Sequence, residues 1–389
     1  MTLVGALAGR GRARVDERGG ITVVGEDWSL DWWIGADDRW RIPAREPTVR
    51  QLLIEGTPVV ETALKVPSGD AVQRVYGVGG PGGIVIIEIE NASPAAFIVA
   101  FTVMGSRSIG GDGSRIEVNG RSTLVVPAPP ARWTIGSDPL DPETIGGDTG
   151  PVPTRTDRKG GVEGAFLFPL SHRNRLRIAV ATSGEDPGPV DLAQAASASD
   201  AANGWHALLD HGMRVVLPDP ARQLQVELAR SQVRLDPDPD ALTTAALEDW
   251  GYDDAAAWAW RGLSLSARRA ARRSRSGPLD LTTPGGQLIA VRRELVRDDG
   301  AAIEIALEPP PAGQDFEVHE VPTCFGTLSY ALRWHGERAA LLWEVTDPAP
   351  NLALRAPALD PTWSTTKPSG DALLTPPTTP APPAPPAHP

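Results

Sequence analysis

Cysteine is almost absent from this chain of 389 residues, which contains only Cys324. One thiol excludes an internal disulfide and a cysteine-based metal cluster, so nothing in the sequence requires an oxidising compartment. Long apolar runs are also lacking, because no stretch approaches the roughly 20 apolar residues that cross a bilayer. The apolar start is short and is followed by Arg10, Arg12 and Arg14, which reverses the order of a signal peptide. We therefore expect a soluble, cytoplasmic protein.

Positive charge is scarce as well. The chain has 37 Lys and Arg against 49 Asp and Glu, a formal net charge of -12, whereas binding to nucleic-acid phosphates needs a basic surface. We therefore expect neither a nucleic-acid nor a membrane partner. One short exception is a run of five arginines, which we expect to spread around a solvated helix end and balance neighbouring carboxylates. Contact with RNA or a membrane is the alternative for these residues, which are Arg268, Arg269, Arg272, Arg273 and Arg275.

Several motifs that carry chemistry are missing. No serine lies in a Gly-x-Ser-x-Gly elbow, and no twelve-residue calcium loop occurs. The glycine-rich run at 77–83 leads into another predicted strand, whereas a phosphate-binding loop leads into a helix. Glu317, His319 and His335 are a conceivable cluster for a metal or for proton transfer, although such residues more often form an exposed strand face. We predict no metal and no cofactor.

Glycine and proline are abundant instead, at 40 and 39 residues, and apolar residues make up 41% of the chain. This composition is typical of many short strands joined by turns and disfavours an all-helical fold. We predict an α+β fold that is mainly β, with an N-terminal β-sandwich over residues 1–190. Residues 84–90 and 96–103 are predicted to pair as a hairpin in the sheet interior, because Asn, Ser and Pro connect them.

The sequence becomes rich in alanine near residue 191, and a short helical segment is predicted over 191–276. Asp219 and Pro220 are a typical helix start, and Asp240 begins a second helix that Gly251 ends. A third helix begins at Asp253 or Asp254.

The β pattern is predicted to return after residue 276 and to form a smaller C-terminal β-domain over 277–366. Residues 327–334 and 339–345 are expected to form a hairpin whose polar face meets solvent. Residues 367–389 consist mainly of Ser, Thr, Pro and Ala, which predicts a disordered, Pro-rich tail.

The segment 27–40 combines four tryptophans with four aspartates. In a strand, Trp32 points to one face and Trp33 to the other, which it shares with Asp31. An indole beside hydrogen-bond acceptors on an exposed face suits a sugar ring, so we predict an oligosaccharide site at Trp33, Asp31 and Trp40. The alternative is that Trp33 packs under a loop or under the helical segment.

Two stretches resemble bacterial glycosidases of the glucoamylase and trehalase kind. Residues 217–235, which begin Leu-Pro-Asp-Pro-Ala-Arg, are similar to the first helix of their (α/α)6 catalytic toroid, and residues 245–257 are similar to a later helix-turn-helix. The predicted domain order also looks like theirs. The helical segment is too short for twelve helices of about twelve residues each. The resemblance therefore implies ancestry and glycan contact without hydrolysis, and no catalytic residue is carried over from it.

Two pairs of carboxylates are candidates for catalysis, because glycoside hydrolysis needs two carboxyl groups about 5–10 Å apart. Asp37 and Asp38 follow the tryptophan strand, and Glu248 and Asp249 stand at a predicted helix end. The alternative is that the first pair forms a turn with a salt bridge to a neighbouring arginine and that the second pair faces solvent.

Three functions are consistent with these patterns. The leading hypothesis is a noncatalytic glycan-binding or glycosidase-derived protein. The second is a reduced glycoside hydrolase that uses two of the four carboxylates. The third is a structural or assembly protein that binds other proteins through an exposed sheet face or through the tail.

Overall fold

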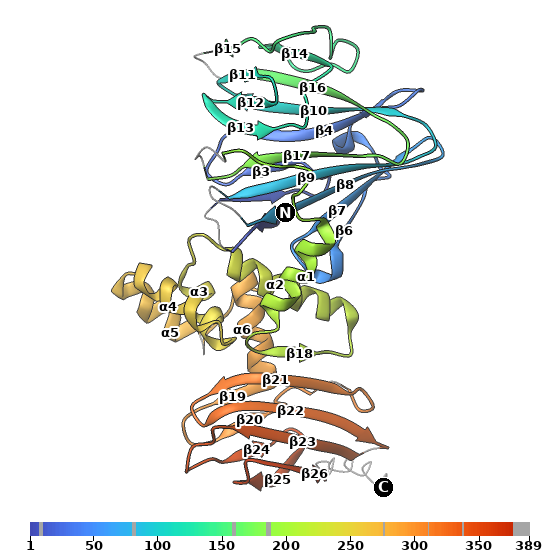
Figure 1. Ribbon diagram of the computed structural model, residues 1–389. Coiled ribbons are helices and arrows are strands. Elements are labelled where there is room, and N and C mark those ends of the chain that lie inside the picture. The colour runs from blue at the N-terminus through green and yellow to red at the C-terminus, as the bar shows by residue number, and fades with distance from the viewer. Residues whose placement is uncertain are drawn as a thin grey trace, which may run out of the picture. The chain divides into compact units, whose positions relative to one another are not determined.

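The computed structural model describes residues 1–7, 11–79, 83–157, 161–183, 188–274, 277–309, 311–336 and 338–375. The chain is mainly β, as predicted, with 41% strand and 21% helix. It divides into two compact units (Figure 1). The first comprises residues 1–208 and 234–237, and the second comprises residues 209–233 and 238–389.

The first unit is a β-sandwich, as predicted. The side chains of Trp32, Phe101 and Ile87 fill the space between its two sheets. One sheet has the strand order β1-β2-β3-β4-β10-β16-β14, with β5 beside β4. Its strands are β1 Thr2–Gly5, β2 Arg12–Val15, β3 Ile21–Val23, β4 Ser29–Gly35, β5 Trp40–Arg41, β10 Phe97–Ser106, β14 Arg132–Gly136 and β16 Val162–Leu170.

The other sheet has the order β15-β11-β12-β13-β17-β9-β8-β7-β6. Its outer face is covered by the segment around residues 190–202, where the hydroxyl of Tyr76 donates to the carbonyl oxygen of Ala196 at 3.0 Å. The strands are β6 Arg50–Leu53, β7 Val60–Val66, β8 Gly69–Val78, β9 Ile84–Ala92, β11 Ser108–Asp112, β12 Arg115–Val118, β13 Arg121–Val125, β15 Arg155–Thr156 and β17 Arg175–Ala181.

The predicted hairpin of residues 84–90 and 96–103 is wrong. β9 pairs with β17 and β8, whereas β10 pairs with β16 and β4 in the opposite sheet. The connection is a corner in which the buried Asn91 amide donates to the carbonyl oxygens of Ala95 at 2.9 Å and Leu170 at 3.1 Å. Turn residues predict that the chain reverses, but they do not specify whether it returns to the same sheet. Both strands do lie in sheet interiors, as expected.

The helices belong mainly to the second unit, and several begin and end where the sequence predicts. The carboxylates of Asp219 and Asp240 accept backbone N–H groups at the starts of α2 and α3, at 2.9 and 2.7 Å. Gly251, with φ +76°, ends α3. No helix among the described residues is long and apolar enough to cross a membrane. The bounds are α1 Ala198–Leu209, α2 Pro220–Leu235, α3 Ala241–Asp249, α4 Asp253–Gly262, α5 Leu265–Ser274 and α6 Pro284–Leu295.

Helix α6 lies where the sequence predicts the return of strands. Its start has a clear signal, because the Thr283 hydroxyl accepts the N–H of Gly286 at 3.2 Å and Pro284 occupies the first turn. Two glycines in that turn have low helix propensity, so the sequence pattern does not predict a helix there. The helical segment therefore continues to Leu295 instead of ending near residue 276.

The rest of the second unit is two sheets. Their orders are β18-β21-β22-β23-β26 and β19-β20-β24-β25. The hairpin of β22 and β23 forms as predicted and closes at His335 and Arg338. The strands are β18 Arg214–Val216, β19 Val296–Asp298, β20 Ile303–Ile305, β21 Phe316–Thr323, β22 Gly326–His335, β23 Arg338–Thr346, β24 Leu354–Ala356, β25 Asp360–Thr365 and β26 Ser369–Leu373.

Strand β26 lies inside the predicted tail. It pairs with β23 from Ala340 opposite Leu373 to Glu344 opposite Ser369. The tail prediction is therefore wrong for residues 369–373, because composition cannot reveal an edge strand that gains its hydrogen bonds from a distant partner. The part of that prediction over residues 376–389 lies outside the described residues.

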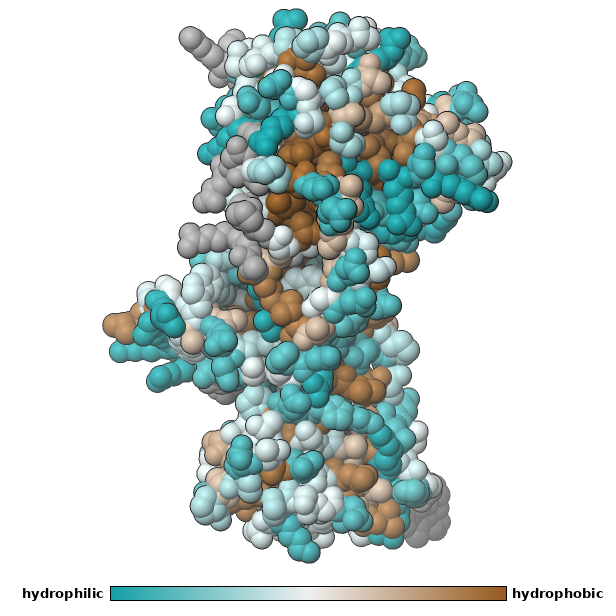
Figure 2. Space-filling view, viewed as in Figure 1, coloured by the Kyte–Doolittle hydropathy of each residue, from teal (hydrophilic) through white to brown (hydrophobic). Residues whose placement is uncertain are grey.

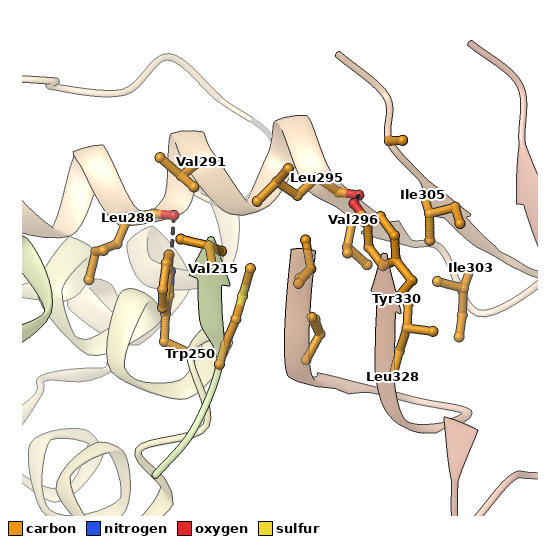
Figure 3. Close-up of a cluster of buried hydrophobic side chains, with 14 of the residues drawn as sticks. Val215, Trp250, Leu288, Val291, Leu295, Val296, Ile303, Ile305, Leu328 and Tyr330 are labelled. Carbon is orange, nitrogen blue, oxygen red and sulfur yellow. Dashed lines mark hydrogen bonds between the residues drawn. The ribbon is translucent and has the colours of Figure 1, made fainter. Parts of the chain in front are cut away.

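One core joins the helices and sheets of the second unit, with α6 along its length (Figure 3). The buried Trp250 indole donates to the carbonyl oxygen of Leu288 at 3.0 Å, and the Tyr330 hydroxyl donates to that of Leu295 at 2.9 Å. Each of these large side chains is buried with its polar atom hydrogen-bonded. A helix fixed at two points in this way explains why helices and sheets form one compact unit.

Candidate functional site

The tryptophan strand forms as predicted, and its alternation is correct. Trp32 points into the core of the sandwich, and Trp33 points to the opposite face of β4. However, Trp33 is only 4% exposed. It belongs to a separate apolar cluster with Ile42 and Leu167 on the outer side of the sheet. The expectation that this ring faces solvent is therefore wrong.

The short strand β5 and one loop cover Trp33. Trp40, Leu140 and Ile145 pack against its cluster. The ring of Trp40 lies close against the strand, because a Cβ at Gly35 would approach it to 2.9 Å. Strand periodicity specifies the face to which a side chain points, but not whether loops return to cover that face. The alternative, that Trp33 packs under a loop, is confirmed. Carbohydrate binding at Trp33, Asp31 and Trp40 stays a prediction, and the burial of the Trp33 ring does not favour it.

Asp31 and its neighbours form a polar group in this covered region. Asp31 lies opposite Thr102 on β10, and burial raises the pKa of its carboxyl to about 6, although the N–H of Trp32 donates to it at 2.8 Å. The Thr102 hydroxyl is buried and has no hydrogen-bond partner among the described residues, and the Trp33 indole lies close enough to the Asp31 carboxyl to lower its pKa somewhat. Burial therefore favours the protonated form of Asp31 up to about pH 6, and the ionised form at neutral pH carries a cost in stability.

We predict that Asp31→Asn makes the protein more stable at neutral pH. Because the folded pKa lies above the ordinary value of 3.8, the wild type loses stability as pH rises from about 4 to about 6, by an amount on the order of 2–3 kcal/mol. The neutral amide should abolish that loss. Urea unfolding of both proteins at pH 4 and pH 7 measures it, with exposed Asp37→Asn as the control. An equal pH dependence of wild type and Asp31→Asn would show that burial does not shift this carboxyl.

The first candidate pair, Asp37 and Asp38, is exposed, and one of its members is paired with an arginine. Asp38 is exposed and forms an ion pair with Arg41 at 2.6 Å, which lowers the pKa of Asp38 to about 2. Asp37 is exposed beside it. A carboxylate held by arginine stays ionised, so Asp38 is poorly suited to act as a general acid.

The second pair lies in the other unit. Glu248 is exposed and accepts the indole N–H of Trp260 at 3.1 Å. Asp249 lies in a groove of about 570 Å³ beside α6, whose wall also contains Arg292 and Arg293. On the other side of α6, a groove of about 510 Å³ contains Glu294, which is paired with Arg222. The described linings of both grooves contain no aromatic ring, so neither offers a sugar platform.

In the candidate cluster of Glu317, His319 and His335, the glutamate is paired with an arginine. Glu317 accepts His319 at 2.8 Å on β21 and is also paired with Arg333 of β22. The hydrogen bond from Arg333 lowers the pKa of Glu317. Within the described residues, no group of three or more His, Cys, Asp or Glu is arranged to hold a metal ion. Glu317 is thus part of an ion-pair network on the sheet surface.

The outer face of the five-stranded sheet is an exposed sheet face of the kind that the third hypothesis requires. Polar residues meet solvent there, as expected for β22, but apolar residues interrupt them. Leu342 on β23 is 46% exposed, and Leu373 on β26 and Val216 on β18 are exposed too. A signal was present, since Leu341 and Leu342 are consecutive, and in a strand one of two consecutive residues must face outward.

No protein-family model matches the chain, and no curated protein matches it. The resemblance to glycosidase domains therefore stays a prediction from two short stretches.

Proposed function

We propose that this protein is an assembly protein that joins copies of itself through the outer face of the five-stranded sheet. The observation that supports the proposal is the exposed Leu342 among small neighbours. It lies opposite Ala331 on β22, and Ala340 precedes it on the same face of β23. The small side chains of Ala331 and Ala340 leave space above the sheet beside Leu342. This fits a second copy of the same surface, in which each leucine packs over Ala340 of the other copy.

The charges along β23 are arranged in the same self-complementary way. Outward residues of β23 read Arg338, Ala340, Leu342 and Glu344. Arg338 and Glu344 are exposed, and neither is ion-paired with a carboxylate or cation among the described residues. Arg338 donates only to backbone carbonyl oxygens, those of Leu373 at 3.0 Å and Leu374 at 3.3 Å. A two-fold axis parallel to the sheet and perpendicular to β23 places Arg338 of one copy over Glu344 of the other. Opposite charges at both ends of an apolar centre favour this register and disfavour others.

The size of the face limits the affinity. Five strands about 4.8 Å apart and six residues of about 3.3 Å give roughly 480 Å². Stable dimers bury about 800 Å² on each partner. We therefore expect a weak dimer that forms as the concentration rises, and we do not expect an obligate one.

We predict that Leu342→Lys abolishes the self-association. Two like charges near the centre of the interface repel each other, and the apolar contact is lost. Sedimentation velocity over a concentration series should show a rising weight-average sedimentation coefficient for the wild type and a constant one for Leu342→Lys. Leu52→Lys is the matched control, since Leu52 is 54% exposed on a strand of the other unit. A wild-type coefficient that stays constant, or an equal loss in the control, would exclude this interface.

A further inference from the structure

A second surface with a different chemistry lies on α5. Its arginines occupy one face of the helix and do not surround it, which corrects the expectation from the sequence. The side away from them includes Ala271, which is fully buried. Positions i, i+3, i+4, i+7 and i+8 share one side of a helix, and in α5 these are Leu265, Arg268, Arg269, Arg272 and Arg273. Arg275 lies outside the described residues.

The sequence supplies no nearby carboxylate to neutralise this face. Neither Asp nor Glu occurs from residue 255 to residue 279. Arg269 and Arg272 are exposed, as is Arg261 at the end of α4. None of these three forms an ion pair with a described carboxylate. In a protein whose formal net charge is -12, these three arginines are a local exception that selects an anionic partner.

Large apolar side chains lie on the same two helices. Leu265, which begins the arginine face, is 75% exposed, and Trp258 on α4 is 56% exposed. Helices α4 and α5 project from the rest of the second unit (Figure 1). Figure 2 shows hydrophobic residues at the outer end of this projection among hydrophilic ones. A projecting surface of this kind contacts a flat partner without obstruction from the rest of its unit.

We propose that α4 and α5 bind the surface of an anionic lipid bilayer. Arginines reach headgroup phosphates, an indole favours the polar boundary of the bilayer, and a leucine enters the acyl region below it. RNA would use the arginines but would leave Leu265 in water. An acidic protein would need its own apolar pocket. The combination of Arg269 and Arg272 with the exposed apolar side chains therefore favours lipid over both.

The test is co-sedimentation of the full chain with vesicles of phosphatidylcholine alone or mixed with phosphatidylserine. We expect binding to the anionic vesicles only, with a loss of binding in about 1 M salt, where the screening length falls to about 3 Å. Each arginine near such a surface contributes about fivefold in affinity. Arg269→Ala with Arg272→Ala should therefore weaken binding about 30-fold. The matched control is Arg45→Ala with Arg355→Ala, two exposed arginines elsewhere.

Two further variants separate lipid from other anions. Leu265→Ser and Trp258→Ser should each weaken vesicle binding, while circular dichroism stays unchanged because both side chains are exposed. Equal binding to neutral vesicles, no binding to anionic vesicles at low salt, or an equal effect of the control pair would overturn the proposal. Binding to single-stranded RNA that depends on the arginines but not on Leu265 would replace it with an RNA site.

Discussion

Replacing Trp33 by alanine will lower the free energy of unfolding by about 3–5 kcal/mol, the range for deletion of a buried large aromatic ring. The ring fills the cluster between β4, the short strand β5 that contains Trp40 and the loop that contains Leu140. Its removal leaves a cavity that these segments cannot fill without moving. A ring displayed on the surface for a sugar would instead contribute to ligand binding and little to stability.

Chemical denaturation monitored by circular dichroism measures this effect. Trp258→Ala is the matched control, because the same side chain is 56% exposed there and its loss should change stability by no more than about 0.5 kcal/mol. If Trp33→Ala kept the wild-type stability but lost binding to an oligosaccharide on a glycan array, the ring would act as a platform, and its covered position would be contradicted.

Replacing Glu88 by alanine will have an effect of similar size, about 3–5 kcal/mol. Its side chain is 1% exposed and forms ion pairs with three arginines of the neighbouring strands, Arg74, Arg175 and Arg177. The distances are 3.2 Å to Arg74 of β8 and 2.7 Å to Arg177 of β17. Removal of the carboxylate takes its partner from the partly buried Arg177, whereas Arg74 and Arg175 keep Glu90. The penalty comes mainly from the charge of Arg177 and not from the lost contact itself.

The control for this prediction is Glu61→Ala. Glu61 binds the same Arg74 at 2.7 Å, but its side chain is 24% exposed, so solvent can replace it and the cost should stay near about 1 kcal/mol. Thermal and urea unfolding of the two variants under the same buffer conditions compare them directly. Equal losses would mean that burial of Glu88 does not determine the strength of its ion pairs.

Local signals in the sequence predicted local structure well. The Asp219 and Asp240 caps, the stop at Gly251 and the β22–β23 hairpin all form, because each depends on residues only a few positions apart. The same holds for the opposite orientations of Trp32 and Trp33. These features follow from backbone periodicity and from hydrogen bonds made within one turn.

Features that depend on distant parts of the chain were not predictable in this way. Asn91 marks a corner between sheets because its amide binds Leu170, which is 79 residues away. Trp33 is covered by segments that include Leu140, and β26 exists because β23 supplies its partner. In contrast, the single face formed by the α5 arginines was readable from the sequence, since their spacing alone places them together.

The most direct test of self-assembly is to mix two charge-reversal variants. Arg338→Glu and Glu344→Arg each place like charges opposite one another in the proposed dimer, so neither variant should self-associate. In the mixture, the introduced glutamate of one variant meets the introduced arginine of the other, and the native Arg338 meets the native Glu344. Sedimentation velocity of the mixture should therefore show association at or near the wild-type level. Continued absence of association in the mixture, or unimpaired association of either variant alone, would contradict the two-fold contact between the sheet faces.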